Sequence, residues 1–139
     1  MEISPEQAQE LARVAERHGL RLIVAFGSRA TGRSHAGSDL DLAVLPQPGK
    51  SISLRSFGEL AADLSRVFPH VEVDLSVIPY ADALFLKKIF ETAVLLFGEE
   101  TDFRRYRVYA FRRFSEYQPY LQREAQAARA LIHRLRHAG

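Results

Sequence analysis

The sequence predicts a small α/β (α+β) fold, in which a mixed β-sheet carries flanking helices and a long helical tail follows at the C-terminus. Short apolar runs typical of strands alternate with segments whose apolar residues recur every three or four positions, as in helices. With 139 residues, 47% of them hydrophobic and 26% charged, the chain has the composition of one globular domain. We expect the helices to pack on one side of the sheet.

A helix and a strand are predicted at the start of the chain. Ser4 is placed to cap the helix, Gln7 to reach back to that cap, and Gly19 to end the helix. The apolar run at 20–26 contains β-branched residues and is interpreted as a buried strand. It leads into a glycine-serine turn.

The middle of the chain continues this alternation. A small, polar loop at 29–38 precedes a second strand at 39–45, which begins with alternating polar and apolar residues. The other predicted elements are a helix at 54–67, a strand at 71–78, a helix at 81–91 and a short strand at 93–97.

A long helix is expected to follow this body. Thr101 and Asp102 are placed to cap its N-terminus, and Pro119 is expected to kink or restart it. Its aromatic and aliphatic residues form a stripe that needs a surface to lie against.

The charge of the chain divides it into two parts. Residues 98–139 carry nine arginines against five acidic residues, whereas the preceding part has slightly more acids than bases. We therefore interpret 1–98 as a catalytic body and 99–139 as a C-terminal helical extension that forms an interface with a partner or a second copy.

Several classes of protein are excluded by what the sequence lacks. It contains no cysteine, so disulfides, thiolate metal sites and cysteine nucleophiles are ruled out. The acidic, amphipathic N-terminus does not resemble a signal peptide, and no apolar run approaches membrane-spanning length. We expect a soluble, cytoplasmic protein without a membrane partner.

Three aspartates are the candidate catalytic residues. Asp39 and Asp41 stand two apart at the start of a strand, so their side chains share one face of the sheet. Neighbouring carboxylates repel each other, and a divalent cation relieves that repulsion. Mg²⁺ prefers oxygen ligands and keeps positions open for water and phosphate. Asp74 has the same phase on a later strand and is the third expected ligand, with Glu72 in reserve.

We expect these aspartates to hold two Mg²⁺ ions, about 3.5–4 Å apart, which stabilise the attacking and leaving oxygens of an in-line displacement. Asp74 would also help to accept the proton of the acceptor hydroxyl. All three aspartates are therefore predicted to be both metal ligands and catalytic residues.

The turn before the loop is the candidate phosphate-binding element. Gly27 permits close approach of the backbone, and Ser28 with the amides that begin a short helix would bind a phosphate tail. We include Arg29 and Ser38 among the expected nucleotide contacts. Neither the P-loop nor the Rossmann glycine pattern occurs.

Taken together, the segment GSRATGRSHAGSDLDLAVL resembles the signature of minimal nucleotidyltransferases, in the polymerase-beta-like superfamily. Gly27, Ser28, Asp39 and Asp41 correspond to that signature position by position, and Asp74 in VEVDLSVI matches the third carboxylate of the family. The resemblance implies the nucleotidyltransferase fold, ATP as substrate and Mg²⁺-dependent transfer of AMP to a hydroxyl.

The resemblance also implies a partner. Members of this subgroup often act as antitoxins for a small helical RNase toxin of the HEPN type, and they are thought to transfer AMP to a tyrosine of that toxin. The arginine and histidine-x-tyrosine motif of such toxins is absent here, so the chain would be the transferase half of the pair. The basic, aromatic tail would be its docking surface, in a homo- or hetero-oligomer.

Three alternatives stay open at this point. One is a small-molecule transferase similar to the aminoglycoside nucleotidyltransferases, which usually carry a larger second domain. Another is a non-catalytic module that neutralises a toxin by binding it. A third is RNA binding by the basic tail, although nucleic acid is not the partner we expect. The sequence does not fix the acceptor, the base preference or the number of nucleotides transferred.

Overall fold

The computed structural model of the protein describes residues 1–32 and 39–138. Its centre is a mixed sheet of four strands in the order β3-β2-β1-β4. Strand β1 pairs antiparallel with β2 and β4, and β2 pairs parallel with β3. The strands are β1 (Leu20–Phe26), β2 (Leu40–Pro46), β3 (Val73–Val77) and β4 (Val94–Phe97).

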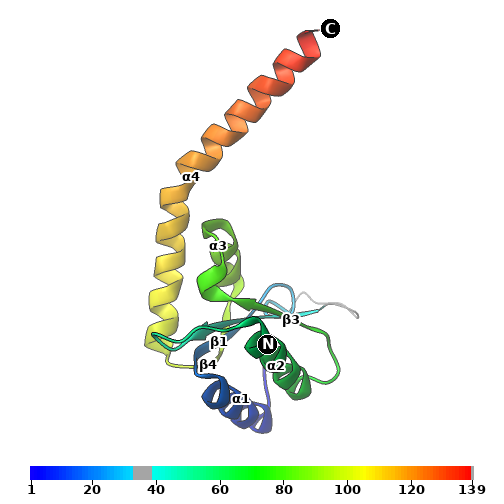
Figure 1. The fold of residues 1–139 in the computed structure, drawn as a ribbon, viewed down its shortest axis with the longest axis vertical. Helices are drawn as coiled ribbons and strands as arrows, with labels where there is room; N and C mark the ends of the chain where they lie inside the picture. Colours follow the sequence, from blue (N-terminus) through cyan, green and yellow to red (C-terminus); the bar gives the residue numbers. More distant parts are fainter. Residues whose placement is uncertain (33–38, 139) are drawn as a thin grey trace.

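Helices cover both faces of this sheet, so the prediction that they pack on one side is wrong. One face carries α1 and α2, and the other carries α3 and the first part of α4 (Figure 1). The two central strands, β1 and β2, bury apolar residues on both of their faces, so both faces of the sheet need a layer of helices. The helices are α1 (Pro5–His18), α2 (Leu54–Val67), α3 (Ala83–Thr92) and α4 (Glu100–His137).

The predicted boundaries of α1 are confirmed. The side chain of Ser4 accepts a hydrogen bond from the Gln7 amide at 3.1 Å, and the Ser4 amide donates to Gln7 Oε1 at 2.9 Å. Gly19 follows the helix in the left-handed conformation, with φ 63°. These contacts are local, which is why the sequence predicts them.

The third strand is shorter than predicted. It begins at Val73 and ends at Val77, after which the 3₁₀ helix η1 (Ile78–Tyr80) turns the chain toward α3. Pro79 lies within this turn, as expected for a residue that cannot continue the ladder.

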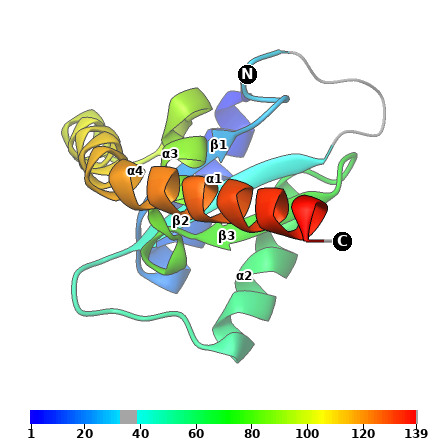
Figure 2. The same cartoon turned by 90° about the horizontal axis from the view of Figure 1, so that it is seen from above.

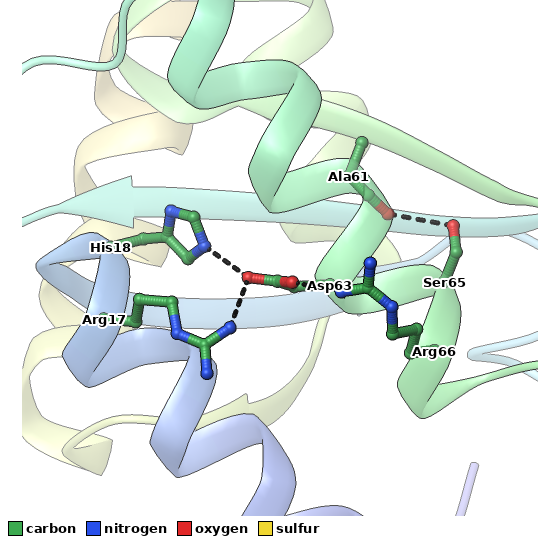
Figure 3. Close-up of polar contacts among 6 residues, drawn as sticks. All are labelled: Arg17, His18, Ala61, Asp63, Ser65 and Arg66. Atoms are coloured by element: carbon green, nitrogen blue, oxygen red, sulfur yellow. Dashed lines mark hydrogen bonds and ion pairs between the residues drawn. The ribbon is translucent and has the colours of Figure 1, made fainter.

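Asp63 fastens α2 to α1 (Figure 3). Its Oδ2 lies 2.7 Å from His18 Nε2 and 3.1 Å from Arg17 Nη1, and its Oδ1 accepts from Arg66 at 2.6 Å. The side chains of Asp63 and His18 are only 10% and 9% exposed. This shielded network joins the two helices that cover one face of the sheet.

The start of α4 differs from the prediction. The helix begins at Glu100, after Glu99, and no side chain caps it. Asp102 instead accepts two hydrogen bonds from Arg21 of β1, at 2.9 Å from Nε and 2.6 Å from Nη2. The Asp102 carboxylate therefore forms a bidentate ion pair with Arg21 and does not cap its own helix. This ion pair connects α4 to the sheet.

Helix α4 then leaves the body. Phe103 and Ala110 are buried, and Phe103 packs on Phe90 of α3 with ring centroids 6.0 Å apart. The helix runs on through Pro119 without a break and changes direction in its middle (Figure 1). The kink is therefore confirmed and the restart is wrong. Among the described residues, no helix combines the length and apolarity needed to cross a membrane.

We call residues 116–137 the projecting half of α4. Nearly all of its side chains are exposed, including Leu131, Ile132 and Leu135 at 52%, 49% and 68%. Figures 1 and 2 show it rising above the sheet on the same side as α3. The predicted apolar stripe therefore packs on the body in the first part of α4, whereas in the projecting half it has no surface to lie against among the described residues.

Candidate active site

The strand register brings the predicted carboxylates to one end of the sheet. Asp41 is the ladder partner of Phe26 on β1 and of Asp74 on β3. Asp39 precedes Asp41 by two residues, so it has the same phase as Asp41. The neighbouring Leu40 and Leu42 point into the core beneath α1 and α2. Asp41 and Asp74 consequently lie on the opposite face, which is the face covered by α3, and Asp39 directly precedes β2 at the same end of the sheet.

Gly27 makes room for Asp41. It has φ 78°, and a Cβ built on it would lie 2.5 Å from Asp41 Oδ2. A side chain at this position would therefore be strained by the backbone and blocked by the carboxylate. The structure brings together two residues that the sequence separates by a loop.

The environment of Asp41 disfavours its charge. Partial burial raises the pKa of the Asp41 carboxyl, and the nearby Asp74 and Asp39 raise it further. The charge of Lys88 acts in the opposite direction and lowers the pKa. A carboxylate held under these conditions is stabilised when a cation binds beside it.

The other two aspartates are exposed and open to a ligand. Asp39 and Asp74 line a hollow of about 700 Å³ at the β3 edge of the sheet, together with Glu72 and with Ser65 of α2. Carboxylate oxygens are the donors that Mg²⁺ prefers, so the chemistry of the set fits this ion. As they stand, however, no three acidic, histidine or cysteine side chains of the described residues are gathered closely enough to hold a metal. Metal binding by Asp39, Asp41 and Asp74 stays a prediction.

The segment after β1 is a turn and not the start of a short helix, as was expected. The Thr31 amide donates to the Gly27 carbonyl at 3.3 Å, and the Thr31 hydroxyl donates to the Ser28 carbonyl at 3.1 Å. Ser28 is exposed on this turn and Arg29 is half-buried. Ser38 lies outside the described residues, so its expected role is untested.

Two residues of α3 lie at the site and were not predicted from the sequence. The Gly27 amide donates to Thr92 Oγ1 at 2.8 Å, so this amide is already used and does not face a phosphate. Lys88 stands one turn earlier on the same helix, and its charge acts on Asp41. No local pattern could have identified either residue, because both meet the site only through the packing of α3.

Comparison with known families decides the class of protein. Residues 9–102 match the family described as polymerase beta, nucleotidyltransferase, and the matched span contains the turn and all three aspartates. The chain belongs to this family. It is a nucleotidyltransferase by family and by fold.

Solved structures with the same fold cover nearly the whole chain. A toxin-antitoxin crystal structure with AMP-PNP aligns with TM-score 0.69 and 27% identity, over 90% of this chain and 97% of the other. A mutant MntA-HpeT toxin-antitoxin structure, with two aspartates changed to glutamate, gives 0.69 and 25% over the same shares. A Shewanella oneidensis complex of tri-AMPylated HEPN toxin with MNT antitoxin gives 0.64 and 24%, over 91% and 96%. No curated protein matches the sequence.

Proposed function

We propose that this nucleotidyltransferase transfers AMP from ATP to a tyrosine hydroxyl of a HEPN-type RNase toxin, in an Mg²⁺-dependent reaction, and so acts as an antitoxin in the cytoplasm. The observation that carries the proposal is the close approach of Asp41 to Gly27, with Asp74 opposite Asp41 on β3. This brings the candidate phosphate turn and the candidate metal ligands together. The similar structures that contain a toxin, and in one case AMP-PNP, support the choice of partner and nucleotide.

ATP would bind between the turn and the aspartates. Ser28, Arg29 and Ser38 would contact the phosphates, while Gly27 lets them approach the backbone. Asp39, Asp41 and Asp74 would hold two Mg²⁺ ions. When bound, the metal would neutralise charge on the phosphates and on the leaving group.

The reaction is a single displacement at phosphorus. The tyrosine oxygen of the partner attacks the α-phosphorus of ATP and forms the new P–O bond, while the bond to the β-phosphate oxygen breaks and pyrophosphate leaves. Asp74 is exposed beside Asp41 and accepts the proton of the attacking hydroxyl.

The acceptor would be presented by a protein that docks on the extension, residues 99–139. The first half of α4 is anchored to the body through Arg21 and Phe90. The projecting half rises on the side of the sheet that carries the aspartates, so a partner bound to it is held above the site (Figures 1 and 2). Its exposed apolar residues and surplus of arginines fit a helical partner with an acidic rim.

The docking surface can be tested apart from the chemistry. Leu131→Glu/Leu135→Glu places charge on the apolar stripe of an exposed helix, so it should abolish binding to the partner and leave AMP-PNP binding unchanged. Arg129→Lys keeps the charge and should bind the partner normally. Partner binding by the double variant with native affinity would refute the docking surface.

The open alternatives give different results with the same protein. A small-molecule transferase would modify an added aminoglycoside and leave the partner unlabelled. A binding module would neutralise the toxin without ATP. RNA binding by the tail would weaken steeply as salt is raised.

A further inference from the structure

One face of α3 faces the candidate active site. Phe85, Lys88 and Thr92 are three and four residues apart, so they lie on the same side of this helix. Phe85 packs edge-on against Phe26, with ring centroids 5.9 Å apart, and Phe26 is the ladder partner of Asp41. At the other end of this face, Thr92 Oγ1 accepts the hydrogen bond from the Gly27 amide. Both fixed points therefore lie beside the carboxylate and the turn.

Lys88 stands between these two fixed points. It is exposed, and within residues 1–32 and 39–138 it has no hydrogen bond or ion pair. The adjacent Lys87 is engaged elsewhere, because its Nζ lies 4.4 Å from the centre of the Phe114 ring on α4. Of this pair of lysines, only Lys88 acts electrostatically on Asp41. A cation with no hydrogen bond or ion pair among the described residues, on the helix that holds the candidate phosphate turn, is suited to an anionic ligand.

We propose that Lys88 is a substrate-binding residue that contacts the phosphate chain of the bound nucleotide. The inference rests on the proposed function, since it takes a nucleoside triphosphate as the ligand. The triphosphate brings several negative charges to a site that already holds three aspartates, and an ammonium group on α3 offsets part of that charge. Thr92 is a positioning residue, because it fixes the turn against the same helix.

Titration calorimetry of the full chain with AMP-PNP and Mg²⁺ tests the proposal without any acceptor. Lys88→Met should weaken AMP-PNP binding by about 10- to 100-fold, the loss expected when one charge-assisted hydrogen bond is removed. Lys88→Arg should recover most of the affinity. The matched control, Lys87→Met, should bind AMP-PNP like the native chain. Both Lys88 variants should unfold at the native temperature because Lys88 is exposed.

Inorganic triphosphate with Mg²⁺ identifies the part of the nucleotide that Lys88 contacts. Its affinity should fall in Lys88→Met by the same factor as that of AMP-PNP, whereas binding of adenosine should not change. Native affinity for AMP-PNP in Lys88→Met, or an equal loss for adenosine, would overturn the inference. If the native chain binds AMP-PNP but labels no partner, the proposed function fails and the inference stands. If the native chain binds no AMP-PNP, both fail.

Discussion

Asp41 Oδ2 lies against the backbone of Gly27, so close that a Cβ on the glycine would come within 2.5 Å of it. The contact joins the end of β1 to the start of β2 at the point where Asp74 stands opposite Asp41 on β3. Gly27 therefore serves the site in two ways: it adopts a left-handed backbone and it leaves space for the carboxylate.

Gly27→Ala should abolish nucleotidyl transfer and lower stability by more than the roughly 1–2 kcal/mol that a left-handed backbone costs a residue with a Cβ. The excess arises because the methyl group displaces Asp41. Gly49→Ala is the matched control, since Gly49 has φ 79° but nothing within 4 Å of its built Cβ. Kinetic assays and urea unfolding of both variants measure the difference. Equal stability losses, with activity retained in both, would show that the contact is unimportant.

Asp41→Asn should raise the unfolding temperature at neutral pH while it abolishes transfer. The pKa of Asp41 is raised in the folded chain, so the ionised carboxylate destabilises the fold above that pKa, and a neutral amide removes this penalty. Calorimetric melting without metal measures the gain. Added Mg²⁺ should then stabilise the native chain but not the variant. A variant that melts below the native chain would contradict this explanation of the pKa.

Thr92→Val should weaken nucleotide use without unfolding the protein. The Gly27 amide loses its acceptor, at a cost of about 1–3 kcal/mol for an unsatisfied group, and the turn loses its fixed position. KM for ATP should rise by more than kcat falls. Thr92→Ser keeps the hydroxyl and should restore KM, whereas equal KM values in the two variants would count against a positioning role.

Asp63→Asn should destabilise the chain by about 1–3 kcal/mol at pH 7, because it breaks the network with His18 and the two arginines. The pKa of Asp63 is lowered, first by its hydrogen bond to His18, so its contribution is complete above the unfolded value of about 3.9 and is lost as pH falls further. Unfolding curves from pH 7 to pH 2 should converge for the two chains. Glu59→Gln, in an exposed pair with Arg55, should change little. A difference that persists at low pH would rule out this linkage.

The sequence predicted best those features that depend on neighbouring residues. The capping box of Ser4 and Gln7 and the end of α1 at Gly19 are local, and the structure confirms them. The cap expected at Asp102 was wrong because Arg21, 81 residues away, binds that carboxylate instead. Strand phase was enough to predict that Asp41 and Asp74 share one face of the sheet.

The parts of the site that escaped prediction all depend on packing. Helices cover both faces of the sheet, and this places α3 over the aspartates. Thr92 and Lys88 reach the turn and Asp41 only through that arrangement, and neither belongs to the signature that contains Gly27 and Asp39. The signature contains the residues at the strand ends, but it does not contain the residues of the helix that packs on them.

The most direct test of the proposed activity is transfer from ATP labelled at the α-phosphate to a co-purified HEPN toxin, with Mg²⁺ present. The native chain should label a toxin tyrosine, and Asp39→Asn/Asp41→Asn should not, although it should still bind the toxin. Toxin neutralised equally by both chains, with no label on either, would contradict the claim that this protein acts as a nucleotidyltransferase on its partner.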